Sequence, residues 1–373
     1  MPSPDVVVVG AGIVGAACAD ALSEAGLSVT ILESRFAGGG ATAAAMGHIV
    51  VMDDSPAQFA LTELSRRLWT GLADAMPASC EDDPTGTLWI AADAEEMAHV
   101  AGKAALYRRR GVEVEELSAR ELARAEPNLR PGLAGALRVP GDRVVYPVNA
   151  ARWLLDRALA RGAVKREGVE AIRIGIRRVE TRGGPIDAGA VVNAAGAAAP
   201  LLTAGLPIQP RKGHLVITDR YPGFCRHQLV ELGYLKSAHT PSPESVAFNL
   251  QPRATGQMLL GSSREFVGFD AGVNRGIRDR MIRRALEFMP ALARLSAIRT
   301  WTGFRPSTPD NLPLIGPVDG TPGLFVAAGH EGLGITTSLG TARLVADAVL
   351  GRTSPIDPVP YFPMRVFPSA AHA

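Results

Sequence analysis

Short apolar runs alternate with helical repeats from the beginning of the chain. Residues 6–9 are four valines, a continuous run typical of a buried strand, and residues 29–32 form a second such run. Between them, residues 13–25 carry apolar side chains at helical spacing. This order predicts a strand, a helix and a second strand, which is the βαβ unit of a parallel sheet.

Capping residues predict the helices that follow. Ser55, Pro56 and Gln58 have the form of a capping box with proline in the first turn, and the leucine repeat behind them ends at Pro77. The same signals predict helices from Asp93 to Gly111, from Ser118 to Pro127, from Asn149 to Gly162, and from the glycines at 329–334 to Gly351.

The pattern changes between about residue 208 and residue 300, where strand-like runs dominate. Such runs occupy residues 214–218, 246–250 and 258–261, and a helix is expected near 276–288. We interpret this region as an antiparallel sheet in a second lobe. A strand at 324–328 then returns the chain to the alternating pattern of its first part.

Composition narrows the class of protein. A chain of 373 residues is long enough for two or three domains, or for two lobes that share a core. Lys and Arg total 39 and Asp and Glu total 37, so the net charge is +2, and no basic stripe favours nucleic-acid binding. No stretch approaches the roughly 20 apolar residues of a membrane span, and residues 1–5 lack the pattern of a secretion signal, so we expect a cytoplasmic protein.

The cysteines do not predict a redox or metal centre. Cys18, Cys80 and Cys225 are odd in number, far apart, and form no C-x-x-C. The sequence therefore predicts no disulfide framework, no metal site and no iron–sulfur cluster. Any redox chemistry needs a bound organic cofactor.

The segment from Gly10 to Gly15 has the G-x-G-x-x-G pattern between a predicted strand and a predicted helix, and Glu33 closes the next strand. Gly10 permits a tight turn, Gly12 allows the backbone to approach a pyrophosphate, and Gly15 allows close packing of helix on strand. The helix N-terminus offers free N–H groups to phosphates, and a carboxylate at 33 can bind a ribose hydroxyl. This combination predicts an adenine dinucleotide site.

Two other small-residue segments, residues 38–48 and residues 329–336, favour FAD over a nicotinamide cofactor. A nicotinamide enzyme would leave them unexplained, whereas the longer FAD molecule needs a second small-residue surface and a further helix N-terminus near its ring. The strand-like run at 190–196 also ends in small residues, and by itself it is equally ordinary core or a strand that passes under the cofactor. An NAD-dependent dehydrogenase remains the alternative at this stage.

Several motifs carry a family resemblance: the Gly10–Gly15 turn with Glu33, the strand at 191–196, residues 303–306 (Gly-Phe-Arg-Pro), and residues 328–330 (Ala-Gly-His). Over essentially its whole length the chain resembles the D-amino-acid oxidase, glycine oxidase and sarcosine oxidase superfamily of flavoproteins. More narrowly, residues 44–54 look like the catalytic (beta) subunit of bacterial dye-linked D-hydroxyproline dehydrogenases.

The resemblance implies which residues hold FAD. The ADP half would be bound near Glu33, the adenine near Val169, and the pyrimidine edge of the flavin at residues 329–336, without a covalent bond because no cysteine is suitably placed. The implied FAD-binding residues are Gly10, Gly12, Ile13, Val14, Gly15, Glu33, Ser34, Arg35, Thr42, Ala45, Met46, Gly47, Val169, Ala194, Gly196, Gly303, Gly329, Gly332, Leu333, Gly334, Ile335 and Thr336.

Three residues are candidates for the catalytic site. On sequence alone Arg305 is equally a solvated surface charge or a bidentate anchor for a carboxylate, and the resemblance favours the anchor. His48 and His330 stand at the edges of the small-residue segments, where each could face the substrate or make a structural hydrogen bond. Lys212 and His214 we interpret as strand-end residues near a domain boundary.

The resemblance also implies domains and a reaction. An α/β fold is expected in which a Rossmann-like FAD-binding domain is interleaved with an antiparallel-sheet substrate domain. The FAD domain would comprise residues 1–76, 145–205 and 300–351, the substrate domain 77–144 and 206–299, and a C-terminal tail 352–373. A small amino or imino acid, first cis-4-hydroxy-D-proline, would transfer a hydride from its α-carbon to flavin N5.

The last expectation concerns the molecule that accepts the electrons from the reduced flavin. The dehydrogenases that this chain resembles are hetero-oligomers, so companion subunits with flavin and iron–sulfur centres would take the electrons and could bring the protein to the inner face of the membrane. The oxygen-using glycine, sarcosine and D-amino-acid oxidases are the alternative.

Overall fold

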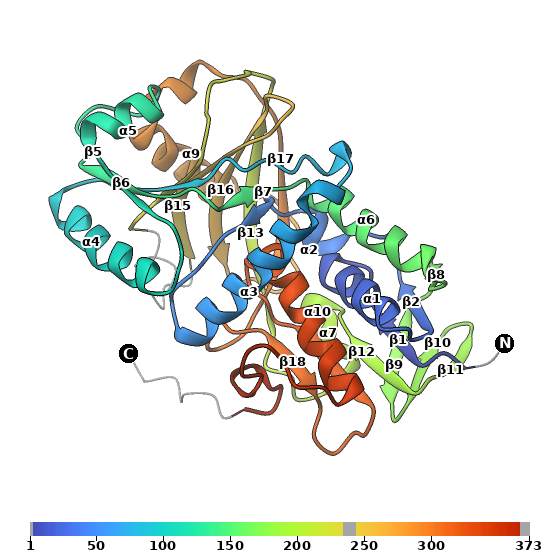
Figure 1. Ribbon diagram of the computed structural model, residues 1–373. Helices are drawn as coiled ribbons and strands as arrows, with labels where there is room; N and C mark the ends of the chain where they lie inside the picture. The colour runs from blue at the N-terminus through green and yellow to red at the C-terminus, as the bar shows by residue number, and fades with distance from the viewer. Residues whose placement is uncertain (1–2, 234–243, 366–373) are drawn as a thin grey trace. The chain divides into compact units, whose positions relative to one another are not determined.

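The computed structural model describes residues 3–233 and 244–365 of the chain. They form two compact units, each assembled from separate stretches of sequence (Figure 1). The first unit comprises Met1–Cys80, Tyr146–Arg211 and Phe304–Ala373, and the second comprises Glu81–Val145 and Lys212–Gly303. Because the chain passes from one unit to the other several times, neither is a continuous segment.

The first unit is built on a six-stranded sheet with the order β18-β19-β12-β1-β2-β8. Its strands are β1 (Val6–Val9), β2 (Val29–Glu33), β8 (Val164–Glu167), β12 (Ala190–Asn193), β18 (Leu314–Pro317) and β19 (Leu324–Ala328). All neighbours are parallel except β18 and β19, which are antiparallel. The predicted βαβ unit is confirmed: α1 (Ile13–Glu24) connects two parallel strands that are almost fully buried, as continuous apolar runs require.

Helices pack against one another beside this sheet. α1 contacts both α6 (Pro147–Ala160) and α10 (Gly334–Leu350), and α10 contacts α3 (Pro56–Leu72), so early and late parts of the chain lie side by side (Figure 1). Shorter elements of this unit are α2 (Gly40–Ala43), β3 (His48–Ile49), η1 (Ala73–Ala75), η2 (Ala78–Cys80), η3 (Gly196–Ala198), α7 (Ala199–Leu202) and η5 (Val359–Tyr361).

The predicted start of one helix is wrong. α6 begins at Pro147, with Tyr146 as its N-cap residue, and not after Asn149. Proline fits the first helical turn because its missing N–H is not needed there. The Asn149 amide instead donates a hydrogen bond of 2.8 Å to the carbonyl of Ser79.

A small antiparallel sheet of three strands, β9 (Ala171–Gly175), β10 (Arg178–Thr181) and β11 (Gly184–Asp187), follows β8. Val169, which the resemblance implies lies near the adenine, is in the connection between β8 and β9. Its N–H donates to the carbonyl of Glu33 at 3.0 Å, so the connection remains attached to the end of β2.

The second unit contains most of an eight-stranded sheet with the order β17-β13-β16-β15-β14-β4-β6-β5. The strands are β4 (Thr87–Ala91), β5 (Glu115–Ser118), β6 (Gly135–Val139), β13 (Gln209–Thr218), β14 (Gln228–Glu231), β15 (Glu244–Pro252), β16 (Met258–Glu265) and β17 (Ala297–Ser307), and β7 (Arg143–Val144) lies outside this sheet. The expectation of an antiparallel sheet needs one correction, because β14 and β4 are parallel. These two strands come from different stretches of sequence, so no tight hairpin forces them to be antiparallel.

Helices of the second unit begin at the predicted caps. Asp93 accepts a hydrogen bond from the N–H of Glu96 at 2.9 Å, and Ser118 with Glu121 forms a complete capping box. The helices are α4 (Ala94–Arg109), α5 (Ala119–Ala125), α9 (Arg275–Phe288) and η4 (Pro290–Arg294). The ring of Phe288 on α9 stacks on Phe248 of β15 with 5.0 Å between centroids, within the core of this unit.

Part of the predicted C-terminal tail is packed on the first unit. Tyr361 is buried, and its hydroxyl donates to the carbonyl of Ala57 at 2.6 Å. Arg365 forms an ion pair with Asp310. The buried ring of Tyr361 and the ion pair of Arg365 hold this segment against the first unit.

Candidate functional site

The glycine turn after β1 is fixed by close backbone contacts. Gly10 has φ +104°, and a Cβ on it would lie 2.6 Å from the carbonyl oxygen of Ala194. A Cβ on Gly15 would lie 2.0 Å from the carbonyl oxygen of Gly10. Only glycine therefore fits at both ends of the turn, which lies against the end of β12.

The start of α1 offers backbone donors. Its N-cap residue, Gly12, makes no side-chain capping bond within the described residues, so the first turn presents N–H groups and the positive end of the helix dipole. One of these donors, the N–H of Ile13, binds Thr42 Oγ1 at 3.0 Å, which brings α2 to the same turn. A side chain on Gly12 would intrude here, since its Cβ would lie 3.3 Å from Thr42 Oγ1.

Glu33 stands at the end of β2 with its carboxylate held beside the turn. Oε2 accepts from the N–H of Ala11 at 2.9 Å, and Oε1 accepts from the N–H of Arg35 at 2.8 Å and from the Ser34 hydroxyl at 3.4 Å. Oε2 accepts only one of these hydrogen bonds and has a second lone pair, so the group can also accept a ribose hydroxyl.

A second helix start lies next to the first. At Gly334, the first residue of α10, a Cβ would lie 3.9 Å from Val14 Cγ2 and 3.5 Å from His330 Cβ. The N-cap residue of α10, Leu333, makes no side-chain capping bond to any described residue. Gly329 has φ +79° and permits the turn that leads into this helix. Two helix N-termini therefore meet in the first unit.

Hydrogen bonds attach the segment around residue 48 to α10. Thr336 Oγ1 donates to the carbonyl of His48 at 2.8 Å and accepts from the N–H of Val50 at 3.3 Å. On the other side, Trp69 Nε1 donates to the carbonyl of Ile335 at 3.2 Å, and Ser65 Oγ donates to the carbonyl of Thr336. The first turn of α10 is therefore bonded to α3 on one side and to β3 and the residue after it on the other.

The two candidate histidines have different surroundings. His330 is 3% exposed, and its Nε2 lies 2.9 Å from Thr341 Oγ1. This contact is a structural hydrogen bond, one of the two roles that the sequence left open for His330. His48 Nε2 is buried and has no hydrogen-bond partner in the described part of the chain. Burial lowers the pKa of each imidazole to about 3, so both are neutral at neutral pH.

Arg305 lies beside the turn before α10. A Cβ on Gly332 would be 3.6 Å from both Cδ and Nε of Arg305, and the N–H of Glu331 donates to the carbonyl of Pro306 at 2.8 Å. The structure thus brings Arg305, His330 and the glycine turn together within one unit. Gly303, two residues earlier in β17, belongs to the second unit.

Sequence reasoning missed several residues that build this site. Ser65 and Trp69 carry no sequence signal, because they lie on the α3 face that the leucine repeat marks only as apolar. Glu331 and Arg211 form an ion pair at 3.7 Å with side chains only 11% and 7% exposed. Glu331 could have been singled out from the sequence, because it is a charged residue inside a glycine-rich turn.

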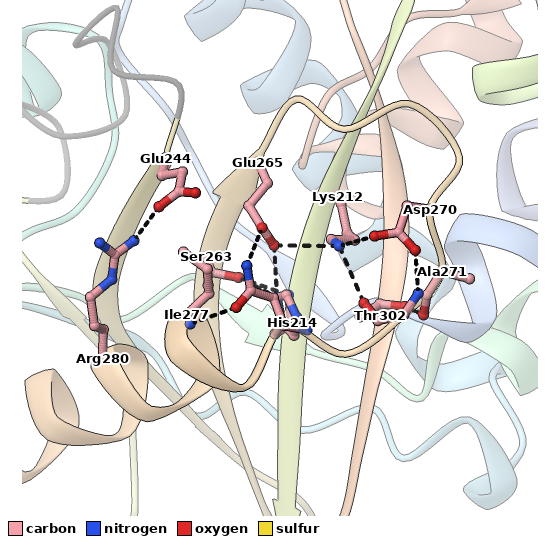
Figure 2. Close-up of polar contacts among 12 residues, drawn as sticks. Lys212, His214, Glu244, Ser263, Glu265, Asp270, Ala271, Ile277, Arg280 and Thr302 are labelled. Carbon is pink, nitrogen blue, oxygen red and sulfur yellow. Dashed lines mark hydrogen bonds and ion pairs between the residues drawn. The ribbon is translucent and has the colours of Figure 1, made fainter.

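Lys212 and His214 are more than strand-end residues. Both are buried in the second unit, where Lys212 Nζ lies 3.0 Å from Asp270 and 3.7 Å from Glu265 (Figure 2). His214 Nε2 accepts from the N–H of Asn274 at 2.9 Å, directly before α9. This network stabilises the connection between β16 and α9.

The first unit fits an adenine dinucleotide better than a metal. All three cysteines are buried and free, and residues 3–233 and 244–365 contain no cluster of His, Cys, Asp and Glu suited to a metal ion. In contrast, the first turns of α1 and α10, whose N-cap residues make no side-chain capping bond to a described residue, supply N–H donors for phosphates. The Glu33 carboxylate and the unpartnered Nε2 of His48 are suited to a ribose and a heteroaromatic ring. None of the described helices combines the length and the apolar character needed to cross a bilayer.

These features define a dinucleotide-binding protein, and the comparison with protein families identifies the class. Residues 5–348 match the model of the DAO family, described as FAD dependent oxidoreductase, and the chain belongs to this family. It is an FAD-dependent amino-acid oxidoreductase with FAD as its cofactor. This finding sets aside the NAD-dependent alternative.

Relatives with different activities are similar to the chain over much of its length. Glycine oxidase of Geobacillus kaustophilus is 30% identical, over 96% of both chains. D-amino acid dehydrogenase of Xanthobacter autotrophicus is 31% identical, over 80% of this chain and 71% of its own. The crystal structure of L-proline dehydrogenase from P. horikoshii has a TM-score of 0.88 and 26% identity, covering 97% of this chain and 98% of its own.

Proposed function

We propose that this enzyme oxidises a small amino or imino acid whose carboxylate is bound by Arg305. The observation that carries the proposal is the position of Arg305 beside Gly332, next to the start of α10. A guanidinium binds a carboxylate through two parallel hydrogen bonds, which fixes the α-carbon in one orientation. The FAD-binding residues inferred from the sequence remain part of this proposal, and the second unit is proposed as the substrate lobe.

Neither candidate histidine is a strong base in this proposal. Because burial lowers the pKa of His48 and His330 to about 3, each can donate or accept a hydrogen bond but does not carry a charge at neutral pH. An amine that binds neutral assists the departure of a hydride with its own lone pair. When bound, FAD supplies the acceptor for that hydride at N5. The protein then needs to orient the C–H bond and exclude water.

The first candidate substrate is cis-4-hydroxy-D-proline or a similar D-imino acid. The resemblance of residues 44–54 to D-hydroxyproline dehydrogenases supports it, and two relatives are named for related chemistry: one for D-amino acids and one for L-proline. A general D-amino acid or an N-alkyl glycine is the second candidate, which the similarity to glycine oxidase supports.

The electrons are proposed to pass to companion subunits that contain flavin and iron–sulfur centres. Two of the similar proteins are named dehydrogenases, which supports an acceptor other than oxygen. In this proposal the protein is cytoplasmic and reaches the inner face of the membrane through its partners. Direct use of oxygen, as in an oxidase, is the competing reaction.

One experiment tests substrate and mechanism together. The purified protein with its FAD is mixed anaerobically with cis-4-hydroxy-D-proline, D-proline, glycine or sarcosine, and loss of the visible flavin absorption is followed. We expect the fastest loss with cis-4-hydroxy-D-proline, and a slower rate when its α-hydrogen is replaced by deuterium. Faster reduction by glycine or sarcosine would reassign the substrate. A solvent isotope effect without an α-deuterium effect would contradict hydride transfer.

The acceptor is tested in a second assay with the same substrate under air, with and without an artificial dye. If companion subunits accept the electrons, the isolated protein should form peroxide slowly under air and should turn over fast when the dye is present. Fast peroxide formation that dye does not change would identify a self-sufficient oxidase.

A further inference from the structure

The sheet of the second unit has two unlike faces where β4, β14 and β15 lie side by side. On one face, apolar side chains pack into the hydrophobic core of this unit: Leu88, Ile90, Leu229 and Leu250. Side chains alternate between the faces along a strand, so the neighbouring positions point the other way. These positions are polar on all three strands: Thr87 on β4, Gln228 on β14 and Asn249 on β15.

This polar face is buried and not solvated. Thr87, Gln228 and Asn249 are only 0%, 1% and 7% exposed. Even so, Thr87 Oγ1, Gln228 Oε1 and Asn249 Oδ1 have no hydrogen-bond partner among the described residues. An unpaired buried polar atom is costly, and native proteins hydrogen-bond nearly all such atoms. Three of them on one face therefore indicate a partner from outside the chain.

The strand register places the three side chains close together. Gln228 is the neighbour of Thr87 in the parallel pair of β14 and β4, and such strands lie about 4.8 Å apart. Asn249 is opposite Val230, two residues after Gln228, so it is a diagonal neighbour of Gln228 at about 7–8 Å. A single small group on this face is within reach of all three side chains.

The unpaired atoms define the chemistry of that group. The Thr87 hydroxyl can donate and accept, and the amides of Gln228 and Asn249 each offer a carbonyl oxygen as acceptor. A carboxylate, which only accepts, does not match two carbonyl oxygens. None of the three side chains is charged, so an ammonium would be buried without a counter-charge. A hydroxyl group, which donates one hydrogen bond and accepts others, fits this uncharged set.

We propose that Thr87, Gln228 and Asn249 bind a hydroxyl group of the substrate and so select hydroxylated over unhydroxylated amino or imino acids. The inference rests on the proposed function, in which the second unit is the substrate lobe. A site built to hydrogen-bond a hydroxyl disfavours the analogue that lacks it, because the buried groups of the site are then left unpaired.

The test uses pairs of substrates that differ only in one hydroxyl: cis-4-hydroxy-D-proline with D-proline, and D-serine with D-alanine. The holoenzyme is mixed anaerobically with each compound, and the ratio of the flavin reduction rates within each pair is measured. Thr87→Val keeps the shape of the side chain and removes its hydroxyl, so it should lower the ratio about tenfold. Gln228→Met removes the amide and should lower the ratio as well. Only the hydroxylated compound of each pair should react more slowly.

Thr218→Val is the matched control, because Thr218 is a buried threonine on β13 of the same sheet. Its hydroxyl accepts from the N–H of Met258 at 3.0 Å and donates to the carbonyl of Asp219 at 2.7 Å. This variant should keep the ratio and lose stability in urea unfolding of the holoenzyme without amino acid. Thr87→Val should not lose stability, since its hydroxyl makes no hydrogen bond to a described residue.

A preference for the hydroxylated compound that Thr87→Val and Gln228→Met lose, and Thr218→Val keeps, would support the inference. A preference that survives in both variants, or that the unaltered enzyme lacks, would overturn it while the proposed function stands. Equal destabilisation by Thr87→Val and Thr218→Val would also overturn it, because the Thr87 hydroxyl would then have a structural role. If neither these compounds nor glycine or sarcosine reduces the flavin, the proposed function itself fails, and the inference fails with it.

Discussion

Thr336 and His48 are 288 residues apart in the chain, yet the Thr336 hydroxyl donates a hydrogen bond of 2.8 Å to the His48 carbonyl. The same oxygen accepts from the N–H of Val50, so one side chain connects the start of α10 to the strand β3 and the residue after it. This connection fixes the positions of two proposed flavin-binding segments relative to each other.

Thr336→Val is expected to weaken FAD binding. The variant leaves the N–H of Val50 without its buried partner, which costs roughly 1–3 kcal/mol. Thr337→Val is the control, because the Thr337 hydroxyl donates to the carbonyl of Leu333, the N-cap residue of its own helix. Equilibrium dialysis of FAD and thermal unfolding check the prediction. Equal loss of FAD affinity in both variants would contradict it.

Gly10→Ala is expected to abolish FAD retention. The new Cβ would lie 2.6 Å from the Ala194 carbonyl oxygen, so the turn must move away from β12. Gly26→Ala is a matched control, since Gly26 also has a positive φ, of +89°, but no atom lies within 4 Å of its Cβ position. The flavin content of the purified variants gives the answer, and a Gly10→Ala protein with full flavin content would exclude the turn from the site.

Arg305→Ala is expected to raise KM for the amino acid strongly while FAD remains bound. Loss of a charge-assisted bidentate contact costs roughly 2–4 kcal/mol, or about 30- to 1000-fold in kcat/KM. The exposed Arg352, just beyond α10, provides the control variant Arg352→Ala. Steady-state kinetics with a dye acceptor measure the effect. Unchanged kinetics in Arg305→Ala would remove Arg305 from the substrate site.

His330 makes stability depend on pH. Its pKa is lowered by burial from 6.5 to about 3, so below pH 6.5 the unfolded chain binds a proton that the folded chain does not. The free energy of unfolding should therefore fall as the pH falls from 6.5 toward 3, by up to about 1.4 kcal/mol per pH unit from this residue. His330→Gln should have a correspondingly shallower slope in urea unfolding curves. Parallel pH profiles for the two proteins would contradict the prediction.

Lys212→Met is expected to destabilise the second unit. It leaves the buried carboxylate of Glu265 without its lysine, and breaking a buried ion pair on one side costs about 3–5 kcal/mol (Figure 2). Asp270, whose side chain is 61% exposed, is the control: Asp270→Asn should cost no more than about 1 kcal/mol. In the double variant Lys212→Met/Glu265→Gln part of the loss should be recovered. Chemical unfolding that shows equal effects for both single variants would argue against a buried network.

The sequence was informative where structure is determined locally. The valine run of β1, the glycine turn and the carboxylate at the end of β2 lie within one short segment, and all three take the expected positions. The caps at Asp93 and Ser118 were also found, because a cap binds an N–H only a few residues away.

Features that depend on distant contacts could not be predicted. The parallel pairing of β14 with β4 joins strands from different stretches, and no local pattern specifies it. Trp69 and Ser65 bind carbonyls on α10, and only the folded chain brings those atoms together. The roles of Lys212 and Glu331 also depend on partners that the sequence order does not place nearby.

The interleaved order of the first unit also governs when it can form during synthesis on the ribosome. β12 pairs with β1, which is made early, and with β19, which is made late, and the second helix start belongs to α10. A nascent chain therefore cannot present both helix starts to the cofactor until residue 334 has left the exit tunnel. The complete site can therefore receive FAD only after that point, and a premature stop codon before residue 324 would leave β12 with an open edge.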